Sequence, residues 1–121
     1  MKSDKLQEEL CAIAQRYDLF ECVPCAAALR AFLISQNITG RQISLFTGST
    51  EDPFCNIYHE GWQCNISING RHEAIAVILD DQEVVFDNIC PVGIIRETWL
   101  ESFYCPIQDL GGEIQVTEAE F

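Results

Sequence analysis

The chain has 121 residues, 48% of them hydrophobic, and a formal net charge of −12. This length and apolar content are enough for one buried core, so we expect a single domain over residues 1–121. The excess of acidic residues would be repelled by phosphate groups, which argues against nucleic acid as a ligand.

Two further features bear on the cellular environment. No apolar run reaches the length of about 18 residues that a membrane span needs, and the charged N-terminus is unlike a cleaved signal. The seven cysteines are odd in number, so we expect reduced thiols rather than a disulfide framework. We therefore expect a protein without a membrane partner, either cytoplasmic or delivered as an effector by a route that needs no signal.

The N-terminal third has the pattern of two helices. Apolar residues recur every three to four positions over residues 3–17, which predicts an amphipathic helix. Proline is tolerated only in the first turn of a helix, so a second helix is predicted to begin at Pro24. It should end near Asn37.

The rest of the chain has mainly strand signals. Residues 42–47 alternate, and Asn69-Gly70 predicts a hairpin between residues 65–68 and 71–79. Asp80-Asp81 should turn the chain into a third strand over residues 83–87, which completes an antiparallel meander. A short helix over residues 95–103 and an edge strand over residues 113–117 follow. The expected fold is α+β, with N-terminal helices packed on a small antiparallel sheet.

Cys25 has the predicted position of an activated thiol. It follows Pro24 in the first turn of the second helix, where unpaired backbone N–H groups and the helix dipole favour a thiolate. The same N–H groups, including that of Cys25, could stabilise an oxyanion during acyl transfer. These features make Cys25 the candidate nucleophile.

His72 and Asp87 are the candidate base and the residue that orients it. Ala74 and Ala76 share a strand face with His72, so we expect the second helix to pack on that face and to bring Cys25 to His72. Asp87 is a charged residue in an apolar segment and needs a partner. Ideal hairpin register places it on the wrong face, and a shift of one residue corrects this. Asn88 is the alternative orienting residue.

Three segments carry a family resemblance. The run Cys22-x-x-Cys25-Ala26, the run Asn69-Gly70-Arg71-His72 and the run Val85-Phe86-Asp87-Asn88 occur in this order. Together they resemble the second family of papain-fold toxin domains of bacterial polymorphic toxin systems. The resemblance covers roughly residues 18 to 105, and its order of Cys, His and Asp is shared with papain-like and transglutaminase-like folds.

The resemblance implies a papain-like cysteine hydrolase that acts on amide or ester bonds of a protein substrate. The reaction would be that of a peptidase, a deamidase or an acyl transferase, and no cofactor or metal is expected. The nucleophile would be Cys25 or, as the alternative, Cys22, with His72 and Asp87 completing a triad. A toxin domain would have a cognate immunity protein as a further partner.

Other interpretations of the same residues stay open. Cys22-Val23-Pro24-Cys25 also resembles a thioredoxin-type motif, in which the first cysteine attacks. A zinc site could combine both cysteines with two of Cys55, His59 and Cys64. If the cysteines and histidines are structural, the protein is an acidic binding module of the immunity type.

The large aromatic residues have a simpler interpretation. Trp62, Trp99 and Phe103 are expected to belong to the core rather than to form a substrate platform.

Overall fold

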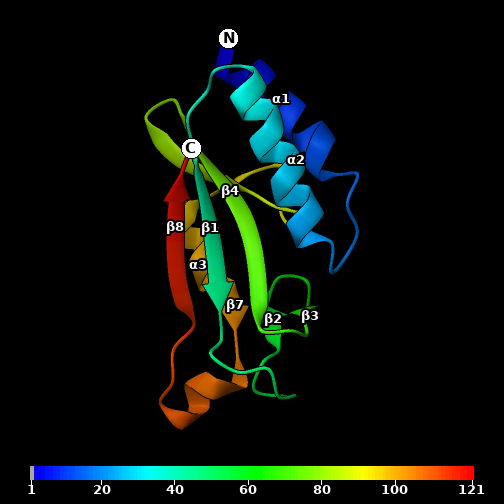
Figure 1. The fold of residues 1–121 in the computed structure, drawn as a ribbon, viewed down its shortest axis with the longest axis vertical. Helices are drawn as coiled ribbons and strands as arrows, with labels where there is room; N and C mark the ends of the chain where they lie inside the picture. The colour runs from blue at the N-terminus through cyan, green and yellow to red at the C-terminus, as the bar shows by residue number, and fades with distance from the viewer. Residues whose placement is uncertain (1) are drawn as a thin grey trace.

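The structure, a computed structural model, describes residues 2–121 and combines helices with two antiparallel sheets (Figure 1). This arrangement confirms the expected α+β class. In chain order the elements are α1 (Lys2–Ala14), α2 (Cys22–Ser35), β1 (Arg41–Phe46), β2 (Ile57–His59), β3 (Cys64–Ser67), β4 (Arg71–Leu79), β5 (Gln82–Phe86), β6 (Ile94–Ile95), α3 (Arg96–Glu101), β7 (Phe103–Tyr104), the 3₁₀ helix η1 (Pro106–Leu110) and β8 (Gln115–Glu120).

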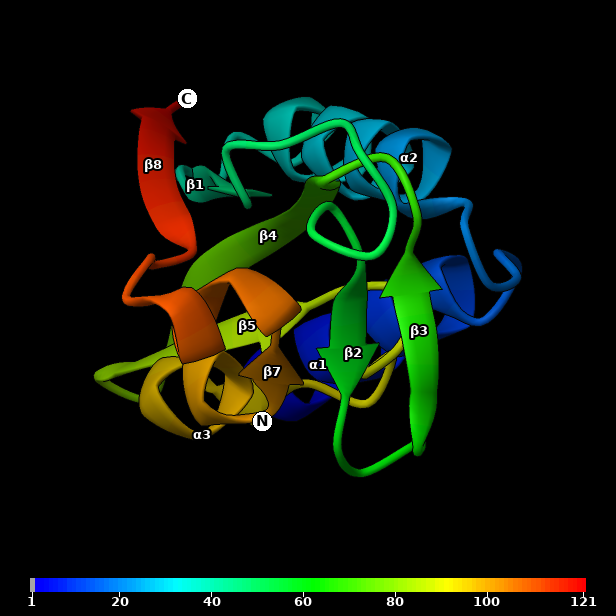
Figure 2. The same ribbon diagram turned by 90° about the horizontal axis from the view of Figure 1, so that it is seen from below.

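The larger sheet has the strand order β6-β5-β4-β1-β8, and the smaller sheet has the order β3-β2-β7. Helices α1 and α2 lie side by side on one face of the larger sheet, where α2 packs along β4 and α1 contacts β5 (Figure 1). Leu10, Leu29 and Ile75 belong to the core between them. A second core, which includes Trp99 and Phe103, lies between the other face and the smaller sheet (Figure 2).

Helix α2 begins at Cys22, two residues before the predicted start at Pro24. The first N–H groups of a helix have no acceptor within it, so proline is tolerated at the third position as well as at the first. The N–H of Cys25 already donates to the carbonyl oxygen of Glu21 at 3.1 Å. The expectation that Cys25 lies in the first turn with a free N–H is therefore wrong, and Cys22 holds that position.

The prediction of a three-stranded meander is correct for one hairpin and wrong for the other. Strands β4 and β5 pair through a turn in which Asp80 and Asp81 both have positive φ. By contrast, β3 pairs with β2, and β4 turns away to pair with β1. The reason lies at Gly70, whose carbonyl oxygen accepts the Thr47 N–H at 2.9 Å and so ties β4 to the end of β1.

The register of the β4–β5 hairpin decides the face on which Asp87 lies. Ile75 pairs with Phe86, so the next residue, Asp87, comes opposite Ala74 and on the face of His72. Helix α2, however, packs on the face of Ile75 and Val77. The expectation that it packs against Ala74 is wrong, because the small residues instead make room for the core around Trp99.

The other predicted elements occur with shifted ends. Helix α1 stops three residues before the predicted end at residue 17, α3 lies within residues 95–103, and β8 forms the sheet edge slightly later than expected. Over residues 2–121, no helix has both the length and the apolar character required for a membrane span.

Gly70→Ala should destabilise the fold more than Gly111→Ala. Both glycines have positive φ, 83° and 86°, which costs an alanine about 1 kcal/mol. Only at Gly70 would the added Cβ also meet the Ser49 carbonyl oxygen, at 2.5 Å, while at Gly111 no atom lies within 4 Å. Urea unfolding of both variants measures the difference. Equal losses of stability would show that the contact at Gly70 does not restrain the start of β4.

Candidate active site

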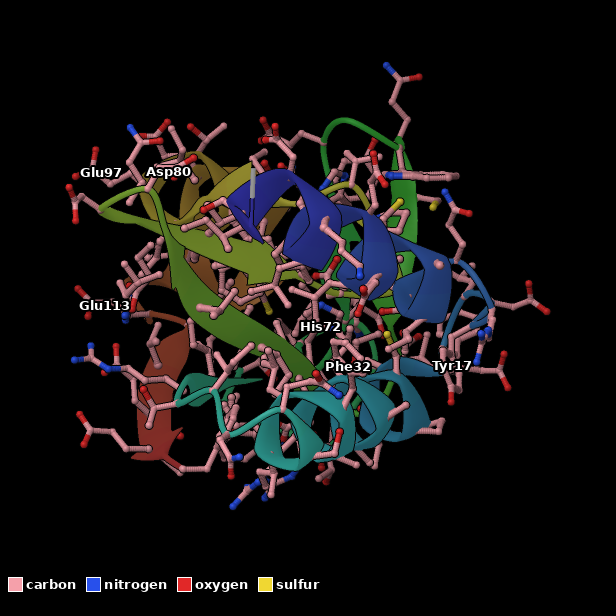
Figure 3. The ribbon with its side chains drawn as sticks, turned by 90° about the horizontal axis from the view of Figure 1, so that it is seen from above. Tyr17, Phe32, His72, Asp80, Glu97 and Glu113 are labelled. Atoms are coloured by element: carbon pink, nitrogen blue, oxygen red, sulfur yellow. The ribbon has the colours of Figure 1, made fainter. Side chains whose placement is uncertain are left out.

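The centre of the candidate site is a buried pair formed by His72 and Asp87. His72 Nε2–H donates to Asp87 Oδ2 at 2.8 Å, and both side chains are 0% exposed. Figure 3 shows His72 well inside the molecule, whereas Asp80, Glu97 and Glu113 lie at its outer boundary. The structure thus brings together the predicted base and the predicted orienting residue.

Asp87 is held by three further hydrogen bonds. The indole N–H of Trp99 donates to Oδ2 at 2.8 Å, and the backbone N–H groups of Ile89 and Cys90 donate to Oδ1. Burial by itself would raise the pKa of Asp87, but the hydrogen bond and charge of His72, together with the Trp99 and Cys90 donors, lower it. Asp87 is therefore a carboxylate fixed in one orientation.

His72 is protonated over an unusually wide pH range. Burial alone would lower the pKa of its ring, but the interactions with Asp87 and with the Cys22 thiol outweigh burial and raise the pKa to about 9. The ring also lies against Trp99 and Phe103, at centroid distances of 6.1 and 5.5 Å. These aromatic side chains exclude water from the imidazole.

Cys22, and not Cys25, is the thiol that faces His72. Nε2 of the ring is hydrogen-bonded to Asp87, and Nδ1 has no hydrogen-bond partner among residues 2–121. Burial would raise the pKa of Cys22, but interaction with the His72 ring and a hydrogen bond from the Glu73 backbone lower it. Cys22 thus has the surroundings of a thiolate, at the first residue of α2 where the helix dipole adds to them.

Cys25 has the opposite surroundings. It is 0% exposed in the core beneath α2. Burial, followed by the negative charges of Asp87 and Cys22, raises its pKa to about 12. The structure therefore does not bring Cys25 to His72, and it gives Cys22, the alternative that the sequence left open, the position expected for Cys25.

Asn88 contacts the segment before α2 rather than the histidine. Its side-chain N–H donates to the Asp18 carbonyl oxygen at 2.9 Å. Within that segment the N–H of Asp18 donates to the Glu21 carboxylate, and Phe20 has a positive φ of 71°, a strained conformation for a bulky residue. Asn88 therefore helps to fix the loop that delivers Cys22.

Two adjoining cavities open at this loop. A small cavity of about 80 Å³ is lined by Cys22 together with Phe20, Val23 and Ile68. A larger one of about 330 Å³ includes Leu19 and Trp62 in its lining. Consecutive residues line the two cavities, since Phe20 lines the small one and Leu19 the larger one. Cys22 is 7% exposed and lines the small cavity, whereas His72 is fully buried.

Of the two tryptophans expected in the core, Trp99 lies there and Trp62 does not. Trp99 is buried and is also a hydrogen-bond donor to Asp87, a role that no local sequence signal indicates. Trp62 is 61% exposed, so its assignment to the core is wrong. Phe103 is buried as expected.

The residues suggested for a zinc site are not clustered. Within residues 2–121 there is no group of three or more His, Cys, Asp or Glu side chains that could hold a metal ion. Cys55 instead donates its thiol hydrogen to the Ile68 carbonyl oxygen, and His59 accepts the Trp62 N–H. All seven cysteines are free thiols.

Comparison with known proteins gave one finding. The family described as papain fold toxin 2 matches residues 5–104 of the chain. Searches of curated proteins and of solved structures found no match.

At about pH 6, iodoacetamide should alkylate Cys22 before any other cysteine in the folded protein. An ordinary thiol with a pKa of about 8.5 is less than about 1% ionised at this pH, whereas the lowered pKa of Cys22 gives it a larger thiolate fraction than the other cysteines. Cys25 should stay unlabelled until the protein unfolds. Peptide mass spectrometry after timed labelling measures both rates, and faster labelling of Cys25 would contradict the assignment drawn from the geometry.

Proposed function

Since this chain belongs to the papain fold toxin 2 family, we propose that it is a cysteine hydrolase in which Cys22, His72 and Asp87 form the catalytic triad. The observation that carries the proposal is the His72 ring, hydrogen-bonded to a buried carboxylate on one side and facing a low-pKa thiol on the other. This differs from the sequence prediction in the nucleophile alone.

The first step would be acyl transfer to Cys22. In the range between the lowered pKa of Cys22 and about pH 9, the thiolate and the imidazolium coexist. The thiolate attacks the substrate carbonyl carbon, a C–S bond forms, and the carbonyl π electrons move to oxygen. When the tetrahedral intermediate collapses, His72 gives its Nδ1 proton to the leaving amine or alcohol. A thioester to Cys22 remains.

The second step would release the acyl group. Neutral His72 takes a proton from water, the resulting hydroxide adds to the thioester carbonyl, and the C–S bond breaks to regenerate the Cys22 thiolate. Asp87 retains its carboxylate throughout and stabilises the charged imidazole. An amine in place of water would give acyl transfer, and a side-chain amide substrate would give deamidation.

The start of α2 supplies a donor for the oxyanion. No backbone acceptor takes the N–H of Cys22 among the described residues, whereas the N–H of Cys25 is used by Glu21. An N–H at the end of a helix dipole stabilises negative charge that develops on the carbonyl oxygen. This placement favours Cys22 over Cys25 for a second, independent reason.

The site favours a hydrolase over the alternatives considered for the sequence. A disulfide oxidoreductase that uses Cys22 and Cys25 has no need of a histidine oriented by a buried aspartate, and neither has a binding module. We propose a protein as the substrate, attacked at an amide or ester bond. A cognate immunity protein is the partner proposed for a toxin domain.

Cys22→Ser and Cys25→Ser should separate these functions. In a hydrolase, Cys22→Ser removes the nucleophile and should lower turnover by at least about 10³-fold, because the residual rate comes from binding and oxyanion stabilisation alone. Cys25→Ser should keep turnover within about 10-fold, at some cost in stability because Cys25 is buried. A fluorogenic casein derivative and a mixture of glutamine-containing peptides serve as substrates. Disulfide reduction of insulin that needs both cysteines would overturn the proposal.

Asp87→Asn should lower the pKa of His72 and reduce turnover strongly. The raised pKa of about 9 depends on the Asp87 carboxylate, so its loss leaves less imidazolium beside Cys22, and the onset of Cys22 alkylation should move to higher pH. Turnover should fall by up to about 10⁴-fold, as in the Ser-His-Asp template. Asp81→Asn removes the same charge from the exposed β4–β5 turn and is the matched control. An unchanged pH profile of alkylation in Asp87→Asn would remove Asp87 from the site.

A further inference from the structure

Trp62 is exposed, yet its position is fixed by two hydrogen bonds. Its backbone N–H donates to His59 Nδ1 at 3.0 Å, and its indole N–H donates to the Ile89 carbonyl oxygen at 3.1 Å. His59 is itself buried, and Ile89 gives its own N–H to the catalytic carboxylate of Asp87. A ring that is 61% exposed is thus tied to the segment that holds the proposed triad.

The cavity beside Trp62 has the size and lining for an apolar side chain. Its volume of about 330 Å³ lies at the lower end of the range for ligand pockets, which suits one large side chain rather than a whole cofactor. Leu19, Tyr17 and Pro91 contribute further apolar atoms to the cavity lining. Asp18 also lines the cavity, so an acidic side chain would be repelled.

Strand β3 connects this cavity to the nucleophile. Its first residue, Cys64, lines the Trp62 cavity, and its last residue, Ser67, lines the small cavity at Cys22. β3 is an edge strand, so one row of its backbone N–H and C=O groups has no partner within the sheet. A strand of this length spans about 10 Å, so an extended peptide of about four residues along it would reach from Trp62 to the thiol.

We propose that Trp62 is a specificity-determining residue whose ring, together with Leu19, receives a bulky apolar side chain of an extended protein substrate near the bond that Cys22 attacks. The inference rests on the proposed function, because it concerns the substrate of the same site. The anchored indole offers a preorganised apolar surface. Binding of the substrate side chain removes this surface and the apolar surface of the side chain from water, which contributes favourable free energy.

The test uses covalent probes that differ in one side chain. Acetylated tetrapeptide chloromethyl ketones are made from glycine, with a single phenylalanine placed in turn at each of the three positions before the last residue. The Cys22 thiolate displaces chloride, and the second-order rate is divided by the iodoacetamide rate of the same variant. One phenylalanine position should react at least about 10-fold faster than the all-glycine probe, and glutamate at that position should give no gain.

Variants of Trp62 assign the preference to the ring. The quantity compared is the ratio of the normalised rate of the preferred phenylalanine probe to that of the all-glycine probe. Trp62→Ala should reduce this ratio to within about 3-fold of one. Trp62→Phe should keep most of the preference because it retains a flat apolar surface. Leu110→Ala removes an exposed apolar side chain that lines neither cavity, and it should leave the ratio unchanged. A preference that survives Trp62→Ala would overturn the proposal, as would equal rates for all probes.

Fluorescence gives a readout that does not depend on reaction rate. The chain has two tryptophans and Trp99 is buried, so acrylamide quenching of the folded protein reports mainly Trp62. In the adduct with the preferred phenylalanine probe, quenching should fall relative to the all-glycine adduct. Unchanged quenching would place the side chain elsewhere and contradict the proposal.

The two proposals fail in distinguishable ways. If Cys22 does not react with iodoacetamide at about pH 6, the proposed nucleophile is wrong. If it reacts but shows no preference among the peptide probes, Cys22 keeps its role and the Trp62 subsite is wrong.

Discussion

The hydrogen bond between His72 and Asp87 is the interaction on which the organisation of this protein depends. Burial of a carboxylate or of an imidazole without a partner costs desolvation free energy, and the hydrogen bond between His72 and Asp87 offsets this cost for both groups. The structure commits Trp99 and two backbone N–H groups to the same carboxylate. The need of the Asp87 carboxylate for hydrogen-bond donors therefore helps to position α3, which carries Trp99, and the segment after β5, which supplies the backbone N–H groups.

The sequence predicted the parts of this arrangement that depend on local chemistry. An apolar strand that ends in aspartate indicated a buried carboxylate in need of a partner, and Asp80-Asp81 indicated the turn that brings it back towards β4. Whether Asp87 would share a face with His72 depended on a single residue of register, which alternation alone does not determine. The structure has the register that aligns them.

The errors came from features that local patterns do not specify. Proline is allowed at several positions of a first turn, so Pro24 predicted the start of α2 only to within a few residues. This uncertainty is as large as the spacing between Cys22 and Cys25, so the pattern could not decide which of them lies at the helix start. The Asn69-Gly70 pair predicted a turn. It did not predict that the N–H of Thr47, the residue after β1, would donate to the Gly70 carbonyl oxygen and draw β4 into the other sheet. The link between Trp62 and Ile89 is likewise a contact of long range.

The two cores of the fold meet at the candidate site. Cys22 is carried by α2, which belongs to the core around Leu29, whereas Asp87 is held by Trp99 in the core on the opposite sheet face. His72 lies at the start of β4, where these halves join. A mutational scan scored by activity would consequently mark residues of both cores as if they were catalytic. In such a scan, loss of the catalytic geometry and loss of packing would give the same phenotype unless folding were measured in parallel.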